Sequence, residues 1–394
     1  MRTFWREWGS FSLPARRYLV MHFLAGGLMI GYVISPVYLR TLGLTIVGVG
    51  ALYTIADLAR VGLTYLAGRW LDGRGARTGI ILDWWLSAVS CAIYAVSTRF
   101  WHLVLGELAE KASALFRAGY AAYQNEAYEE PHRERLLAYQ MALPYLVQVP
   151  VFPLVALVLA YWWTDVTAYR VVIGACGAGM VALGVYCRRC LPNLGVVSAG
   201  ERPPLWPRVP RSLLALMAVE LLINASVVIG SGFVTAFLIL ERFQGTVLDV
   251  VLLHVLWGVV TVLTSSLTRN WNIHFSRRQL LCGGVALWIV SNAVLLASQR
   301  IGWLLLSYGL AAAGTAVWFA QHESLKMSLV PEGRRNEFYA CVQALQNLIG
   351  LPLPLLTGLL AARFGLKAPF AIQLLGWVAV WVAYWRLLRH RTAN

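Results

Sequence analysis

Residues 68–77 read GRWLDGRGAR, a short charged stretch that separates two long apolar segments. It contains three arginines, one aspartate and three glycines, whereas the flanking segments 45–67 and 78–97 consist mainly of aliphatic and aromatic residues. An apolar run of about 20 residues is long enough to cross a bilayer as a helix. Glycine allows a short connector to take backbone conformations that other residues avoid. The stretch therefore indicates a tight loop between two membrane-spanning helices.

The composition extends this interpretation to the whole chain. Of the 394 residues, 59% are hydrophobic and only 13% are charged, which is not the balance of a soluble domain. Lipid offers no partner to a free backbone N–H or C=O group, so such a chain must form helices inside the membrane. The apolar runs predict an all-α membrane protein with 12 transmembrane helices, at 18–39, 45–67, 78–97, 100–124, 137–162, 168–187, 212–239, 246–267, 279–298, 301–325, 338–361 and 368–388.

The net charge of +15 reports on topology. If the N-terminus is cytoplasmic, 23 of the 33 Lys and Arg residues fall in cytoplasmic segments, seven in outer loops and three within spans. Cytoplasmic loops of membrane proteins carry such an excess, so both termini are expected to be cytoplasmic. We expect a multi-pass protein of a cell inner (plasma) membrane, in contact with the lipid bilayer and without a nucleic-acid partner.

A long interruption divides the predicted spans into six and six. Residues 188–211 are rich in Pro and Arg and form a predicted cytoplasmic linker between an N-terminal six-helix bundle, 1–187, and a C-terminal one, 212–394. A shift of 200 residues superposes five residues of the first half on identical ones in the second: Arg69 on Arg269, Arg77 on Arg277, Pro131 on Pro331, Arg135 on Arg335 and Tyr139 on Tyr339. The pattern predicts two pseudo-symmetric bundles that arose by duplication, with a central site at their interface.

The charged loop carries a family signature. Gly68, Asp72, Gly75 and Arg77 resemble the G-x-x-x-D-x-x-G-x-[RK] motif of the major facilitator superfamily of secondary transporters. Ala76 stands where that family usually has a second basic residue. The resemblance implies a fold of two six-helix bundles, transport by alternating access, and a cytoplasmic gate formed by these four motif residues.

Ionisable residues inside the spans are the candidate functional residues, because burying a charge in a membrane costs several kcal/mol unless it is paired or hydrated. Asp57 lies 11 residues before Gly68, near the middle of its span, and Arg60 follows at i+3 on the same helix face. Two interpretations stay open for this pair. It either couples protons or binds substrate, or it is an ion pair that locks span two to span four.

Span four supplies a second set of charges. Glu110, Lys111 and Arg117 share one broad side of a helix and predict a cavity wall, while Glu107 is expected closer to the outer surface. In the second half, Glu220 and Asn224 are one helical turn apart, and burial of the Glu220 carboxyl would favour its neutral form, as a proton carrier requires. His254 is either part of the cavity or a packed polar residue.

Charges near the inner end of span ten predict a second-half gate. Glu323 and Lys326 are at i,i+3, and Arg335 follows the next loop. We assign Glu323 and Arg335 to the inner gate of the second half, separate from the substrate site.

Several classes of function have no support in the sequence. No phosphate-binding loop, H-E-x-x-H or G-x-S-x-G motif is present, so neither ATP-driven pumping nor an enzyme is expected. The one C-x-x-C, at Cys187 and Cys190, lacks the partners of a metal or redox centre, and we expect no cofactor and no bound metal.

The sequence therefore predicts a monomeric secondary transporter that moves a small molecule by alternating access, driven by protons. The acid-rich and aromatic-rich spans favour efflux of amphipathic compounds. The three cations within spans fit uptake of an organic anion instead, and a membrane sensor that binds without transporting is a further alternative.

Overall fold

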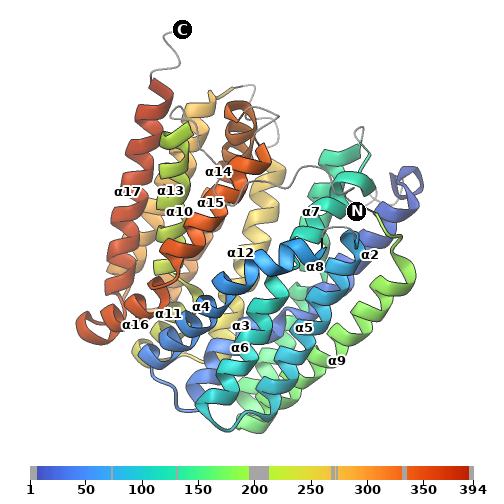
Figure 1. Ribbon diagram of the computed structural model, residues 1–394. Helices are drawn as coiled ribbons and strands as arrows, with labels where there is room; N and C mark the ends of the chain where they lie inside the picture. Colours follow the sequence, from blue (N-terminus) through green and yellow to red (C-terminus); the bar gives the residue numbers. More distant parts are fainter. Residues whose placement is uncertain are drawn as a thin grey trace. The chain divides into compact units, whose positions relative to one another are not determined.

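The computed structural model describes residues 7–71, 74–129, 132–194, 213–267, 271, 274–330 and 335–389, and every regular element in these ranges is a helix (Figure 1). The α-helices are α2 (Leu13–Leu28), α3 (Ile30–Thr41), α4 (Ile46–Leu71), α5 (Ala76–Val96), α6 (Phe100–Ala114), α7 (Ala118–Ala127), α8 (Arg133–Leu157), α9 (Val166–Cys190), α10 (Leu214–Ile229), α11 (Gly232–Phe237), α12 (Val247–Leu267), α13 (Arg277–Ala297), α14 (Ile301–Leu329), α15 (Arg335–Gly350), α16 (Leu353–Phe364) and α17 (Ala368–Arg389). A 3₁₀ turn, η1 (Trp8–Ser10), precedes them, and two π-helical turns, η3 (Val158–Trp162) and η5 (Leu238–Arg242), extend α8 and α11.

Ten helical segments of the described residues are long and apolar enough to cross a membrane, so this is a multi-pass membrane protein. Two of the twelve predicted spans are not among the ten. The span 45–67 coincides with α4, which contributes a shorter apolar stretch, Ile46–Leu58. The span 100–124 is divided into α6 and α7, of 15 and 10 residues. The count of twelve spans remains a prediction.

Several predicted spans that we drew as continuous helices are interrupted. The span 18–39 is broken at Met29, 212–239 at Gly230 and Ser231, and 338–361 at Leu351 and Pro352. Proline lacks the N–H group that would continue the helical ladder, which explains the last break. Discontinuous helices expose backbone groups inside a bundle, and transporters form their binding sites at such places.

The helix bounds follow the offset that the sequence predicted. Helices of the second half begin 201 or 202 residues after their counterparts in the first. The paired first residues are Leu13 and Leu214, Ile46 and Val247, Ala76 and Arg277, Phe100 and Ile301, Arg133 and Arg335, and Val166 and Ala368. Two cations repeat a capping contact at the same offset: Arg170 donates to the carbonyl of Ser97 at 2.5 Å, and Lys367 donates to that of Ser298.

The contacts group the chain into two compact units. The first contains Met1–Tyr38 and Ile55–Arg202, and the second contains Leu39–Thr54 and Pro203–Asn394. This division differs from the predicted bundles in the segment 39–54, which belongs to the second unit. The predicted linker, 188–211, is described only as far as residue 194.

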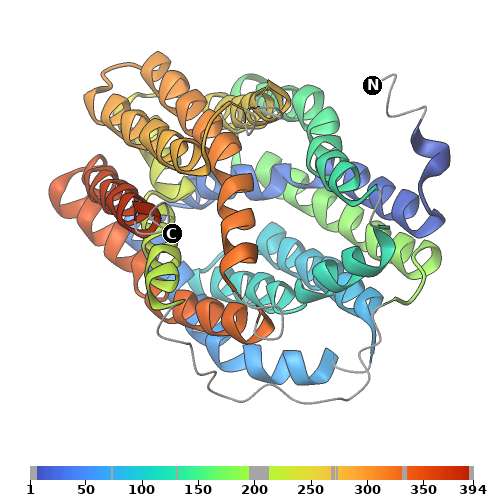
Figure 2. The ribbon, with the colours of Figure 1, turned by 90° about the horizontal axis from the view of Figure 1, so that it is seen from above.

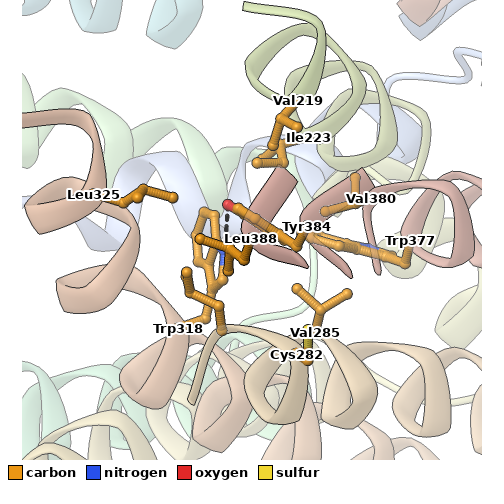
Figure 3. Packing of buried hydrophobic residues seen from close by; sticks show 11 residues of the cluster. Val219, Ile223, Cys282, Val285, Trp318, Leu325, Trp377, Val380, Tyr384 and Leu388 are labelled. Atoms are coloured by element: carbon orange, nitrogen blue, oxygen red, sulfur yellow. Dashed lines mark hydrogen bonds between the residues drawn. The ribbon is translucent and has the colours of Figure 1, made fainter. Parts of the chain in front are cut away.

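Each unit has its own core. In the first unit the largest fully buried side chains are Tyr18, Tyr38, Tyr123, Tyr128 and Phe152, and the rings of Tyr18 and Tyr123 stack with centroids 4.9 Å apart. In the second unit, α17 packs on α10 and α13, which Figure 1 shows side by side. Helices α13 and α14 form an adjacent antiparallel pair, seen in light and darker orange from above in Figure 2. Figure 3 shows the apolar cluster that these four helices enclose.

Two glycines bring α4 and α16 into backbone contact within the second unit. A Cβ atom added to Gly50 would overlap the carbonyl oxygen of Pro354, and one added to Gly358 would lie 2.8 Å from that of Ile46. The N–H of Leu355 donates to Thr54 Oγ1 at 3.1 Å, where Pro352 has interrupted the helical ladder. Close approach of the two backbones therefore requires glycine at both positions.

We predict that Gly50→Ala lowers the free energy of unfolding by about 1–3 kcal/mol, because the added methyl group overpacks this contact. Gly48→Ala is the matched control on the same helix: its Cβ would make only an ordinary contact, 3.5 Å from Thr45 Oγ1. Thermal unfolding of the purified protein, followed by tryptophan fluorescence, measures both. Equal unfolding midpoints for the two variants would contradict the assigned contact.

Candidate functional site

The charged side chains of the first unit gather in two adjoining groups. The Lys111 group consists of Asp57, Arg60, Glu107 and Lys111. The Arg117 group consists of Asp83, Glu110 and Arg117. Helix α4 supplies Asp57 and Arg60, α5 supplies Asp83, and α6 supplies Glu107, Glu110 and Lys111, while Arg117 directly precedes α7. All four carboxylates are largely buried.

In the Lys111 group the ammonium lies between two carboxylates. Lys111 Nζ is 3.1 Å from Asp57 Oδ1 and 3.6 Å from Glu107 Oε1. Arg60 Nε is 3.4 Å from the same Asp57 oxygen. Two cations thus face two carboxylates. The pairing of Asp57 with Arg60 has the predicted i,i+3 geometry, and the contact of Asp57 with Lys111 joins α4 to α6. Glu107, expected near the outer surface, is 8% exposed and belongs to this group.

The Arg117 group forms where span four is interrupted. The N–H groups of Leu115, Phe116 and Arg117 bond to carbonyls three residues back, so the helix tightens and ends before α7 begins. Beside this break, Arg117 Nη2 is 2.8 Å from Glu110 Oε1, and Arg117 Nε is 3.4 Å from Asp83 Oδ1. The Arg117 side chain is 55% exposed, whereas those of Glu110 and Asp83 are 14% and 10% exposed. One guanidinium therefore serves two buried carboxylates and connects them to the surroundings.

Tyrosine hydroxyl groups complete the hydrogen bonding of three of the carboxylates. The donors and acceptors are Tyr94 to Glu107 Oε2 at 2.8 Å, Tyr32 to Glu110 Oε2 at 2.9 Å, and Tyr120 to Asp83 Oδ2 at 2.7 Å. A phenol donates without adding charge, so these bonds orient the carboxylates but leave the charge balance unchanged. With all groups ionised, the first unit holds four carboxylates against three cations.

The second unit contains a further polar group, which we call the Glu220 group: Glu220 on α10 with His322, Glu323 and Lys326 on α14. His322 Nε2 is 2.7 Å from Glu220 Oε1, and Lys326 Nζ is 3.3 Å from the same oxygen. Lys326 Nζ also lies 2.6 Å from Glu323 Oε1. Glu323, which we predicted to belong to an inner gate, is thereby joined to Glu220 through Lys326.

The other second-half candidates lie outside this group. Asn224 Nδ2 donates to the carbonyl of Gln346 on α15 at 3.4 Å. His254 lies on α12 and is not among the side chains that contact Glu220. Arg335 begins α15, and its side chain is outside the described residues. The spacing of Glu220 and Asn224 was correct for one helix, but only the packing of α14 against α10 shows that His322 and Lys326 are the partners of Glu220.

The predicted gate motif is described in part. Gly68 lies in α4, and Asp72 is outside the described residues. Gly75 caps α5 with φ 81° and ψ 155°, a conformation that only glycine adopts readily. Ala76 N–H donates to the carbonyl of Leu194 at 2.9 Å, and Arg77 Nη1 donates to that of Leu191 at 3.2 Å. In the described part of the motif, the loop is therefore anchored to the C-terminal end of α9 within its own unit.

Sequence reasoning missed Asp83, and it named His322 without its partner. Asp83 interrupts the apolar run ILDWWL in the predicted span 78–97, so the signal was present in the sequence. Tyr384, which contacts His322 in the buried core, gave no signal, because tyrosine is common in membrane spans. Within the described residues, no three His, Cys, Asp or Glu side chains are placed to hold a metal ion.

Solved structures with the same fold are membrane transporters. A bacterial homologue of the iron transporter ferroportin, in an inward-facing state, has a TM-score of 0.75 and 15% sequence identity, covering 95% of this chain and 98% of that one. The nucleoside transporter NupG has a TM-score of 0.67 and 14% identity, covering 96% and 99%. The human organic anion transporter MFSD10 has a TM-score of 0.64 and 16% identity, covering 94% and 99%.

These similarities define the fold of the chain as that of major facilitator superfamily transporters, and they confirm the resemblance seen in the sequence. No protein-family model matches the chain, and no curated protein sequence matches it. The structural neighbours are transporters and not enzymes.

We predict that Lys111→Met lowers the free energy of unfolding by roughly 3 kcal/mol, because it leaves Asp57 and Glu107 with one cation between them. The double variant Lys111→Met with Glu107→Gln restores charge balance and should recover most of that loss. Thermal unfolding of the two variants and of Glu107→Gln alone completes a double-mutant cycle. Additive effects would show that Lys111 and Glu107 are not coupled.

Proposed function

We propose that this protein is a proton-coupled secondary transporter of the major facilitator type that exports small amphipathic cations by alternating access. The fold supports the transport class. The charge balance of the Arg117 group supports the coupling and the substrate charge. The predicted rocking of two six-helix bundles about a central site is the movement this fold permits.

The Arg117 group is the observation on which the proposal rests. Glu110 and Asp83 share the single guanidinium of Arg117, so the group has one carboxylate in excess when all its members are ionised. An uncompensated carboxylate inside a membrane costs several kcal/mol. Binding a proton or a cationic ligand removes that cost. The half-exposed Arg117 side chain marks the side from which either can enter.

The Lys111 group supports a different role. Its two carboxylates face two cations, so it has no charge deficit for a proton to correct. Of the two interpretations of Asp57 and Arg60, the geometry favours an ion pair that holds α4 against α6. We therefore assign proton coupling in the first unit to Glu110 and Asp83, and a positioning role to Asp57.

Competition for one site leads from binding to exchange. A proton and a cationic substrate would neutralise the same excess carboxylate, so uptake of one promotes release of the other. In a membrane with an inward proton gradient, this competition drives the substrate outward. An amphipathic cation fits because its charge binds the carboxylates while its apolar part contacts the surrounding aromatic side chains.

Arg117 also supports an alternative. A half-exposed guanidinium can bind a carboxylate bidentately, which would make the protein a carrier of organic anions. In that case Glu110 and Asp83 would hold the guanidinium in place until substrate replaced one of them.

We predict that proteoliposomes with an acidic interior accumulate ethidium, a planar cation, and exclude fluorescein, an anion. Glu110→Gln and Asp83→Asn are expected to abolish gradient-driven accumulation and to leave downhill flux, because neither variant has an excess carboxylate. Asp57→Asn should keep gradient-driven accumulation while lowering thermal stability. Asp165→Asn is the matched control, since Asp165 caps α9 outside the charged groups and asparagine caps equally well.

Each other outcome corresponds to another function. Accumulation of fluorescein that is lost in Arg117→Ala would establish an organic-anion carrier. Thermal stabilisation by a ligand without any flux would establish a sensor. Loss of coupling in Asp57→Asn, with coupling intact in Glu110→Gln, would move the proton site to the Lys111 group.

A further inference from the structure

His322 lies at the centre of a buried chain of hydrogen bonds in the second unit. Trp318 Nε1 donates to the hydroxyl oxygen of Tyr384 at 3.0 Å, shown as a dashed line in Figure 3. The same oxygen is 2.5 Å from His322 Nδ1, and His322 Nε2 is 2.7 Å from Glu220 Oε1. Tyr384 is fully buried and His322 is 2% exposed. The chain links α14, α17 and α10.

The directions of donation in this chain can be worked out from the groups at its ends. An indole N–H can only donate, so Trp318 makes the Tyr384 oxygen an acceptor. The Tyr384 O–H must then donate elsewhere, and His322 Nδ1 is the acceptor that the described residues offer it. His322 Nδ1 therefore carries no proton, and the imidazole proton sits on Nε2, from which it is donated to Glu220.

The opposite arrangement leaves a buried group without a partner. If His322 Nδ1 carried a proton, the Tyr384 oxygen would accept from both Trp318 and His322, and its own O–H would have lost its acceptor in a fully buried position. An unsatisfied buried donor costs about 1–3 kcal/mol. At the other end, the ammonium of Lys326, 3.3 Å from Glu220 Oε1, favours the carboxylate form of Glu220.

We propose that His322 is a positioning residue that stays neutral with its proton on Nε2, holds Glu220 as a carboxylate, and thereby makes Glu220 the proton acceptor of the second unit. This inference rests on the proposed proton-coupled function. Glu220 accepts its proton when α10 separates from α14, because only then does its oxygen leave the donors His322 and Lys326. The proton comes from water and converts the carboxylate into a carboxylic acid, with no other change in bonding.

The protonation state of His322 decides the charge of this group. With His322 neutral, Glu220 and Glu323 face only Lys326, so the group has one carboxylate in excess, as the Arg117 group has. An imidazolium at His322 would balance the charges and remove the reason for proton uptake. The other titratable groups that face the pair are Tyr384 from α17 and, beside Tyr384, the buried thiol of Cys282 on α13. From α15, the Gln346 amide donates to the main-chain carbonyl of Glu220 at 3.4 Å and adds no charge.

Helix packing supports the coupling of this contact to movement. Helix α10 packs mainly on α17 and α15, whereas α14 packs mainly on α13 and α12. The Glu220 side chain reaches between these two pairs to His322 and Lys326. A relative shift of α10 and α14 would therefore break these polar contacts while leaving the packing of each helix on its main neighbours.

The first test is a nitrogen NMR titration of the protein labelled in histidine, with His322 assigned by the signal missing in His322→Gln. We expect a neutral imidazole with the proton on Nε2 from about pH 8 to about pH 5, whereas an unperturbed histidine would become an imidazolium within this range. An imidazolium at pH 7, or a proton on Nδ1, would overturn the proposal. This measurement does not depend on transport, so its failure is distinguishable from failure of the proposed function.

The second test compares two substitutions in ethidium exchange at a series of pH values. His322→Gln keeps an N–H donor for Glu220 but cannot bind a proton, so we expect exchange with an unshifted pH profile. His322→Leu removes the donor and should lose exchange. A flattened pH profile in His322→Gln would identify His322 itself as the proton carrier and overturn the proposal. If either variant fails to fold, the titration of the unmodified protein still decides the protonation state.

Discussion

A carboxylate buried in a membrane has to be neutralised by a cation, a proton or a set of hydrogen-bond donors, and the polar interior of this protein is organised around that requirement. In the first unit, Lys111 satisfies it for Asp57 and Glu107 together with Arg60, and Arg117 satisfies it only in part for Glu110 and Asp83. The difference between a balanced and an unbalanced group assigns a structural role to one and a binding role to the other.

The two units solve the same problem with different residues on the same scaffold. Helix starts recur at an offset of 201 or 202 residues, yet the charges do not. The positions of Glu110, Arg117 and Asp83 correspond at an offset of 201 to Ala311, Trp318 and Gly284. Span length is set by membrane thickness, which acts equally on both halves. A side chain of the interior is set by its own partners, so the second unit places its carboxylate on α10 and its donors on α14.

Some features of the site could be predicted from the sequence, and some could not. The i,i+3 pair of Asp57 and Arg60 was predictable, because one helix determines it. The separation of Glu110 from Lys111 was not. Both were expected along one cavity wall, but Lys111 pairs with α4, and Glu110 pairs with Arg117 beside the break at residues 115–117. That break depends on contacts between α5, α6 and α7, and no proline precedes it to announce it.

The sequence by itself determined that this chain is a helical membrane protein, where its apolar segments lie, which of its ionisable residues are buried in them, and that its halves repeat. These properties follow from local composition and from the length needed to cross a bilayer. Only the tertiary structure decided which carboxylate meets which cation, that Asp83 completes the Arg117 group, and that Tyr384 and Trp318 direct the proton of His322 toward Glu220. Those outcomes depend on side chains from helices far apart in the sequence, whose contacts are set by packing.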